Sequence, residues 1–209
     1  MAQRQVIQLE GDILQCSTGY VLQQCNCLTV HAHGLSAAIA QRWPWADFYD
    51  CRSYRIYGST RNLASESSRP LPGTFDWKLS EQKGTPTVVA LFAQWDFGKP
   101  VEDRSRPYPK LRPEYTQGGE TDSRANRLKW FRKALLNATR FLPDTETVYI
   151  PHGIGCGLAG GHWEDYFAVI QEAQALCPAQ FIILKKPVVL RNVLPLLQQG
   201  DQGQQDQGQ

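Results

Sequence analysis

The chain has 209 residues, a formal net charge of +2 and 42% hydrophobic residues, which together predict one globular domain rather than a disordered polymer. So small a charge does not mark a general nucleic-acid binder, and we do not expect nucleic acid as a partner. The sequence has no apolar run of membrane-spanning length and no apolar signal region after Met1. We therefore expect a cytoplasmic protein with six reduced cysteines.

Strand-like and helix-like segments alternate along the chain. Strands are predicted where apolar and β-branched residues cluster between turn signals, at 6–9, 19–25, 74–78, 87–93, 147–151 and 180–184. Helices are predicted at 35–43, 123–141 and 163–176 from apolar residues at helical spacing, with Asp122 as the N-cap of the second helix. This order predicts an α/β fold, a three-layer α/β/α sandwich with a mixed, largely parallel central sheet.

The domain is expected to span residues 1–197, with loop insertions at 58–86 and 99–121. The second insertion contains four prolines and a Gly-Gly pair, and it is either an ordered flap near a site or a solvated loop. Residues 198–209 are only Gln, Gly and Asp, a composition typical of a disordered tail.

Ligands of open α/β sheets bind beyond the carboxyl ends of the parallel strands, and three loops fall there. The first contains Gly11-Asp12-Ile13, where one carboxylate can accept a hydrogen bond from an exocyclic amine. The second contains Asn26 and enters a helix through Gly34. The third contains five glycines between residues 153 and 161. Amides of glycine-rich loops and helix starts bind anions, so the two later loops suit a diphosphate and the whole set suits a nucleoside diphosphate sugar.

These segments resemble a macrodomain, the ADP-ribose-binding fold, over about residues 5–185. The matching stretches are 6–13 (VIQLEGDI), 25–27 (CNC), 33–39 (HGLSAAI) and 154–163 (IGCGLAGGHW). The resemblance is nearest to the branch that contains ADP-ribose 1″-phosphate phosphatases and terminal ADP-ribose hydrolases. It implies ADP-ribose or a derivative as ligand, with ADP-ribosylated macromolecules among the candidate partners. We expect no cofactor.

The resemblance also implies roles for individual residues. Asp12 would bind the adenine amine, the Ile13 amide a ring nitrogen, and Asn26 the distal ribose. The two diphosphate loops would comprise His33, Gly34, Leu35 and Ser36 on one side, and Gly153, Ile154, Gly155, Cys156, Gly157 and Leu158 on the other. An aromatic residue near the adenine is expected without an assigned position.

The sequence departs from the family in two places. The first phosphate loop keeps only Gly34 where many members have a run of glycines. Members that use a lysyl intermediate have Asp after Gly-Cys-Gly-Leu and Lys after the preceding long strand, whereas this chain has Ala159 and Gln94-Trp95 there. The resemblance therefore does not support the lysyl mechanism.

Several other groups of residues have ordinary interpretations. Cys25, Cys27, His31 and His33 lack the spacing of structural zinc ligands, so no metal site is expected. We expect Cys156 to contribute backbone rather than a nucleophilic thiol, and His162 to cap a helix or face solvent. The cations of the helix 123–141 are expected on a solvated face, Arg127 among them.

Two functions remain open at this stage, with nucleic-acid binding through the basic helix as a weaker third. The first is a hydrolase, acting on ADP-ribose 1″-phosphate or another ADP-ribosyl derivative, in which Asn26 orients a water molecule and His33 assists. The second is a non-catalytic reader of ADP-ribose or ADP-ribosylated partners.

Overall fold

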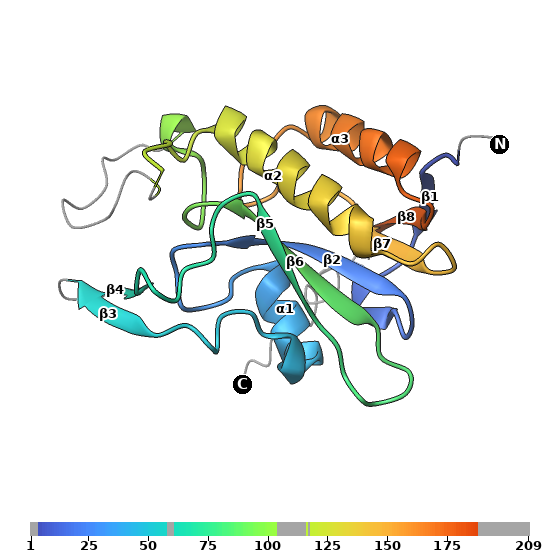
Figure 1. Ribbon diagram of the computed structural model, residues 1–209, viewed down its shortest axis with the longest axis horizontal. Coiled ribbons are helices and arrows are strands. Elements are labelled where there is room, and N and C mark those ends of the chain that lie inside the picture. The colour runs from blue at the N-terminus through green and yellow to red at the C-terminus, as the bar shows by residue number, and fades with distance from the viewer. Residues whose placement is uncertain (1–3, 58–60, 104–115, 117, 188–209) are drawn as a thin grey trace, which may run out of the picture.

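The computed structural model describes residues 4–57, 61–103, 116 and 118–187 (Figure 1). The six strands of its main sheet, in spatial order, are β1 (Ile7–Glu10), β8 (Gln180–Lys185), β7 (Thr147–Pro151), β2 (Tyr20–Asn26), β6 (Thr87–Gln94) and β5 (Thr74–Lys78). All pairings are parallel except that of β5 with β6. The predicted mixed, largely parallel sheet is therefore confirmed.

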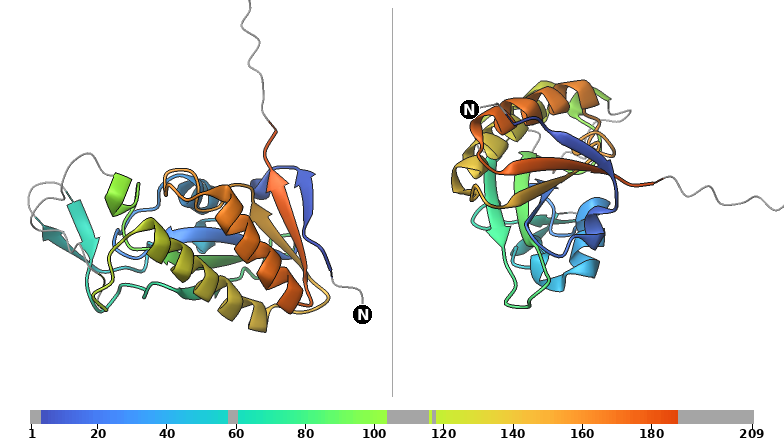
Figure 2. Two further views of the ribbon diagram at one scale, coloured as in Figure 1. Left: turned by 90° about the horizontal axis from the view of Figure 1, so that it is seen from above. Right: turned by 90° about the vertical axis from the view of Figure 1, so that its right-hand side faces the viewer.

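The helices cover both faces of the sheet, which gives three layers (Figure 2). The helices α2 (Arg124–Ala138) and α3 (Trp163–Leu176) lie on one face, and α1 (Leu35–Arg42) lies on the other. The strand β6, which lies between β2 and the edge strand β5, is buried along all but its first residue. This explains its unbroken apolar sequence, because a strand covered on both faces has no solvated side for polar residues.

The described residues also form four short 3-10 helices: η1 (Ile13–Gln15), η2 (Pro44–Ala46), η3 (Val101–Asp103) and η4 (Thr139–Phe141). The turn η1 follows the Gly-Asp turn after β1, η2 begins at Pro44 shortly after the end of α1, and η4 continues α2. The predicted helix 123–141 therefore corresponds to α2 together with η4.

The predicted N-cap of α2 was wrong by one residue. Ser123 is the N-cap, and its hydroxyl accepts a hydrogen bond from the Asn126 amide at 3.2 Å. Asp122 is buried instead, and its carboxylate forms an ion pair with the Arg127 guanidinium. Both residue types cap helices well, so the pair Asp122-Ser123 is ambiguous in sequence.

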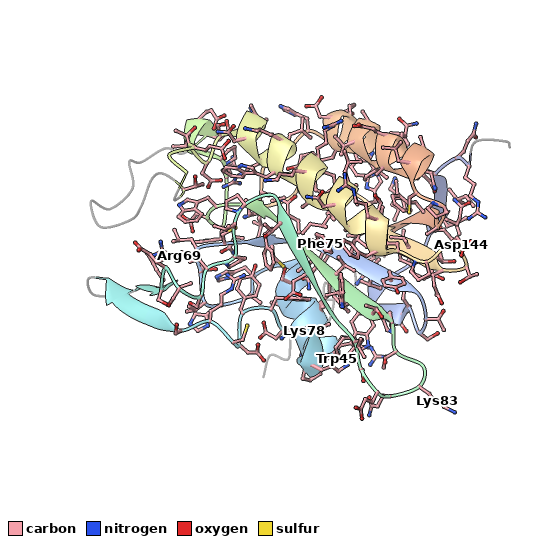
Figure 3. The ribbon with its side chains drawn as sticks, in the orientation of Figure 1. Trp45, Arg69, Phe75, Lys78, Lys83 and Asp144 are labelled. Carbon is pink, nitrogen blue, oxygen red and sulfur yellow. The ribbon has the colours of Figure 1, made fainter. Side chains whose placement is uncertain are left out.

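The range 58–86, expected as a loop insertion with one strand-like patch, contributes two strands. The strand β4 (Arg61–Ala64) pairs with β3 (Tyr54–Tyr57) in a separate antiparallel ribbon that the sequence analysis did not predict. The strand-like patch forms β5, which pairs with β6 in the main sheet. The two faces of β5 contact different layers: Phe75 contacts Phe141 of η4, and Lys78 donates to the Asp47 carbonyl and to Asp50 (Figure 3).

The tail 198–209 lies outside the described residues, as does most of the insertion 99–121. Within the part of the chain that is described, no helix has the length and apolar composition needed to cross a membrane.

Candidate functional site

A cavity of about 250 Å³ opens at the carboxyl edge of the sheet. The last residues of three neighbouring parallel strands line it: Asn26 of β2, Gln94 of β6 and Pro151 of β7. The loops that leave these strands supply the remaining walls. The cavity therefore lies where ligands of open α/β sheets bind.

The glycine-rich loop after β7 forms one wall through residues 153–155 and 157–159. A Cβ atom on Gly155 would lie 2.2 Å from Tyr166 Cε1, and one on Gly161 would lie 2.5 Å from Tyr166 Cε2. The Tyr166 ring of α3 thus occupies the space where both side chains would be. Gly155 also has φ of +74°, a conformation that glycine adopts without strain. The glycines let the loop backbone pack directly on the helix.

The loop before α1 forms the opposite wall through Gly34, Leu35 and Ser36. Gly34 is the N-cap of α1 and offers no side-chain cap, and the first backbone N–H groups of a helix have no acceptor within it. A Cβ atom on Gly34 would lie 3.4 Å from Leu158 Cδ1, so the two loops approach each other. Amide groups of a helix start and of a glycine-rich loop therefore lie on two sides of one cavity.

Asn26 is buried at the base of the cavity with a fixed amide orientation. Its Oδ1 accepts from the Thr29 amide at 2.8 Å and the Thr29 hydroxyl at 2.9 Å, and its Nδ2 donates to Tyr49 Oη at 3.3 Å. Oδ1 therefore already accepts two hydrogen bonds. Nδ2 has two N–H groups, one of which donates to Tyr49. Towards a ligand Asn26 is thus a hydrogen-bond donor rather than an acceptor or a base.

Tyr49 fixes the position of Asn26 by accepting two hydrogen bonds from it. Its hydroxyl also accepts from the Asn26 backbone amide at 3.1 Å, and the guanidinium of buried Arg52 lies 4.1 Å from the centre of its ring. Burial raises the pKa of the Tyr49 hydroxyl well above its usual value, so this hydroxyl stays protonated. Arg52 donates in turn to the carbonyl of Thr29 at 2.6 Å, which closes the network around the turn that follows β2.

Two histidine rings line the cavity, each packed on an aromatic ring. His33 stacks on Phe97 with ring centres 5.0 Å apart, and His152 packs against Trp163 of α3 at 4.5 Å. Both histidines are exposed. Imidazole is the side chain best suited to exchange protons near neutral pH, so these rings are the candidates for acid–base chemistry at the rim.

No Asp, Glu, Lys or Arg is among the described residues that line the cavity. Apart from the two histidines, its polar side chains are neutral amides and hydroxyls, among them Gln24, whose Nε2 donates to Gln94 Oε1 at 3.0 Å. Gln94 Nε2 donates in turn to the Asp96 carbonyl at 2.8 Å. The described lining would therefore hold an anion through backbone amides, neutral side-chain donors and the two histidines.

Three of the predicted ligand residues do not line the cavity. The Asp12 carboxylate accepts from the Leu14 amide at 3.1 Å and pairs with Lys186 at 2.8 Å. The hydrogen bond from Lys186, with that from the Leu14 amide, lowers the pKa of Asp12. Ile13 is buried in the core. Cys156 is half-buried and donates to the Ile154 carbonyl, and burial raises its pKa to about 11.

Comparison with solved structures shows what this fold is. The macrodomain of Mycobacterium tuberculosis DarG superposes with a TM-score of 0.56 at 16% identity, over 88% of this chain and 99% of that one. The macrodomain of Thermus aquaticus DarG superposes with a TM-score of 0.54 at 13% identity, over 87% and 98%. The chain has the macrodomain fold.

A third similar structure is that of Thermosipho africanus DarTG in complex with ADP-ribose. The TM-score is 0.51 at 13% identity, over 90% of this chain and 43% of that one. No protein-family model matches the sequence, and no curated protein sequence matches it. Three-dimensional structure thus confirms the resemblance to the macrodomain fold. Sequence identities this low support the fold and do not identify a branch of the family.

Within this macrodomain fold, the cavity brings together Asn26, His33 and both predicted diphosphate loops. Asp12 lies at the same edge of the sheet, after β1, with β8 between β1 and β7. The sequence did not predict the cavity residues Gln24, Tyr49, Gln94 and Phe97. A signal was present for Gln24, since the polar pair Gln23-Gln24 interrupts the apolar residues of β2.

His162 is the N-cap residue of α3 but makes no side-chain cap hydrogen bond, and it is exposed. Among the residues that the structure describes, no three His, Cys, Asp or Glu side chains gather as metal ligands would. Several cations of α2 have acidic partners: Arg124 pairs with Asp103, Lys129 with Glu120 and Arg132 with Glu172.

Proposed function

We propose that the cavity binds ADP-ribose, either free or as the end group of an ADP-ribose derivative. The observation that carries the proposal is the pair of amide-rich loops, 34–36 and 153–158, which face each other across a cavity with no fixed charge in its described lining. A diphosphate placed between them would accept hydrogen bonds from both sides. The ADP-ribose-bound Thermosipho africanus DarTG shares this fold, which supports the choice of ligand.

The rest of the ligand follows from the order of the strands. From β1 through β8 and β7 to β2, the carboxyl edge presents Asp12, Lys186, His152 and Asn26 in turn. With the diphosphate between the loops, the distal ribose would reach the Asn26 Nδ2 donor and the adenine would extend towards Asp12. The adenine amine would then replace Lys186 as a partner of the Asp12 carboxylate.

A second candidate function is hydrolysis of a bond at the distal ribose. It is favoured by the arrangement of Asn26, a fixed donor at the cavity base, and His33, an imidazole at the rim that is stacked on Phe97. With ADP-ribose 1″-phosphate as substrate, water would supply an oxygen to phosphorus while the ester P–O bond breaks. The leaving sugar oxygen would take a proton, and the products would be ADP-ribose and phosphate. Asn26 would orient the substrate and His33 would accept the proton from water.

Calorimetry with ADP-ribose, run alongside a panel of ADP-ribosyl substrates, tests both functions. We expect ADP-ribose to bind the unmodified protein with one site per chain, and Asn26→Ala to weaken binding at least about tenfold by removing a buried donor. Asn137→Ala, a partly exposed position on α2, is the matched control and should bind as the unmodified protein does. Phosphate release from ADP-ribose 1″-phosphate that Asn26→Ala abolishes would establish the hydrolase. Binding without turnover on any of the substrates would establish a reader, and no binding would refute the proposal.

A further inference from the structure

A buried ion pair lies next to the cavity without lining it. Arg127 of α2 and Asp122, which precedes the helix, are both about 1% exposed at their side chains. The guanidinium contacts the carboxylate through both Nε, at 2.7 Å, and Nη2, at 2.5 Å. A fully buried pair of this kind gives little net stability compared with apolar residues of the same volume. Its other hydrogen bonds indicate what the pair does.

The guanidinium of Arg127 also donates to backbone carbonyls of two separate loops. Nη1 reaches the carbonyl of Gly98 at 2.6 Å and that of Ala159 at 2.8 Å. Nη2 reaches the carbonyl of Asp96 at 3.1 Å. Gly98 follows β6, Ala159 follows β7, and both line the cavity. One side chain thus sets the distance between two walls of the site.

The carboxylate of Asp122 holds the same structure from the other end. It accepts from the backbone amides of Trp95 at 3.1 Å and Asp96 at 3.2 Å, directly after the end of β6. Asp122 therefore fixes the start of one loop, and Arg127 ties that loop to the glycine-rich loop. We refer to Asp122 and Arg127 together as the loop clamp.

The loop clamp is connected to the amides that face the cavity. Ala159 is followed by Gly160, whose amide donates to the Gly157 carbonyl at 3.1 Å, and the Gly161 amide donates to the Gly155 carbonyl at 3.0 Å. Arg124, one turn before Arg127 on α2, donates through Nε to the Gly160 carbonyl at 3.1 Å. A shift at Ala159 would therefore displace the backbone from 155 to 161.

We propose that Arg127 and Asp122 are positioning residues that hold the glycine-rich loop ready for a diphosphate ligand. This inference rests on the proposed ADP-ribose binding. A loop with five glycines loses much conformational freedom when it is ordered. The loop clamp orders the loop before the ligand arrives. The free energy of binding therefore does not have to offset the entropy lost when the loop becomes ordered. Arginine is required because only its planar fork of donors can bind one carboxylate and several carbonyls at once.

The test compares three variants by ADP-ribose calorimetry and thermal denaturation. Arg127→Lys keeps the positive charge but leaves loop carbonyls without a hydrogen-bond donor. Asp122→Asn keeps the side-chain shape but weakens the ion pair and the hydrogen bonds that fix the loop after β6. We expect both to lower affinity about ten- to a hundredfold, the range for displaced binding groups. Asp122→Asn is the milder substitution, so it provides the test if the Arg127→Lys variant does not fold.

Gln174→Met is the matched control for stability. Gln174 is a buried polar residue of α3 whose side chain bonds the Ala179 carbonyl at 2.8 Å and the Phe181 amide at 2.7 Å, at the amino-terminal end of β8, away from the cavity. We expect Gln174→Met to lower the melting temperature while ADP-ribose affinity stays unchanged. Affinity in Arg127→Lys and Asp122→Asn that equals that of the unmodified protein would overturn the proposal.

Hydrogen exchange without ligand separates this inference from the proposed function. We expect the amides of 155–161 to exchange faster in Arg127→Lys or Asp122→Asn than in the unmodified protein, and to be unaffected by Gln174→Met. If the unmodified protein does not bind ADP-ribose, the proposed function fails while faster exchange still supports loop ordering by the loop clamp. Unchanged exchange in these amides would overturn the loop clamp itself.

Discussion

At the scale of single residues, the packing of Gly155 against Tyr166 gives the sharpest prediction for stability. An added methyl group would lie 2.2 Å from Tyr166 Cε1 and 2.7 Å from Gln24 Oε1, at a backbone φ of +74°. Gly155→Ala should therefore lower the free energy of unfolding by about 2–4 kcal/mol, measured by denaturant titration. Gly157→Ala has no atom within 4 Å of its new Cβ and should change stability by less than about 0.5 kcal/mol. Equal stability of the two variants would contradict this packing.

The six cysteines should differ in reactivity because their burial differs. Burial raises the pKa of Cys16 and Cys156 to about 11 and raises that of Cys25, Cys27 and Cys177. A raised pKa leaves less reactive thiolate at pH 8. Cys51 is the exposed cysteine of the set. Brief alkylation of the folded protein, followed by peptide mass spectrometry, should label Cys51 first and the others only after unfolding. Labelling of Cys156 as fast as Cys51 would contradict the structure.

The sequence predicted the site residues that belong to continuous motifs and missed those that distant segments contribute. Asn26, His33 and the two loops follow from glycines and polar residues placed between a strand and a helix. Tyr49 and Phe97 reach the cavity from segments with no motif, because only tertiary packing brings them there. Arg127 was predicted on a solvated face; it is instead buried, because Asp122 and the loop carbonyls satisfy its charge and its donors.

At the scale of elements, the start of α2 separates a helix cap from a buried ion pair. Ser123→Ala removes the cap hydrogen bond to the Asn126 amide and should cost about 1 kcal/mol of stability. Asp122→Ala leaves the Arg127 guanidinium buried without its carboxylate and should cost about 3–5 kcal/mol. Denaturant titration of the two neighbouring variants measures the difference. A larger loss for Ser123→Ala would mean that Asp122 is not the partner of Arg127.

The elements predicted correctly are those with a strong periodic signal. The strands β6, β7 and β8 are apolar runs, and α3 spans the predicted residues 163–176. The ribbon of β3 and β4 was missed because its two strands have four residues each and part of it lies in a region rich in Gly, Ser and Pro. Short strands in such a region look like loop when only composition is considered.

At the scale of the whole molecule, the charge distribution predicts how binding responds to salt. The net charge is +2, and the described cavity lining has no Lys or Arg, so amides rather than exposed cations would hold the diphosphate. Salt weakens interactions between exposed charges most strongly. The Kd for ADP-ribose should therefore change only a few-fold from low to high salt in calorimetry. A steep loss of affinity with salt would indicate a cationic binding surface in place of the amide loops.

We propose that ADP-ribose occupies the cavity at the carboxyl edge of the sheet. The most direct test is an NMR titration of the ¹⁵N-labelled protein with ADP-ribose. We expect the largest amide shifts on Gly34, Ser36 and the loop 153–158, with little change at the amino-terminal ends of β7 and β8. Absence of shifts at saturating ADP-ribose, or shifts centred away from these loops, would contradict binding in this cavity.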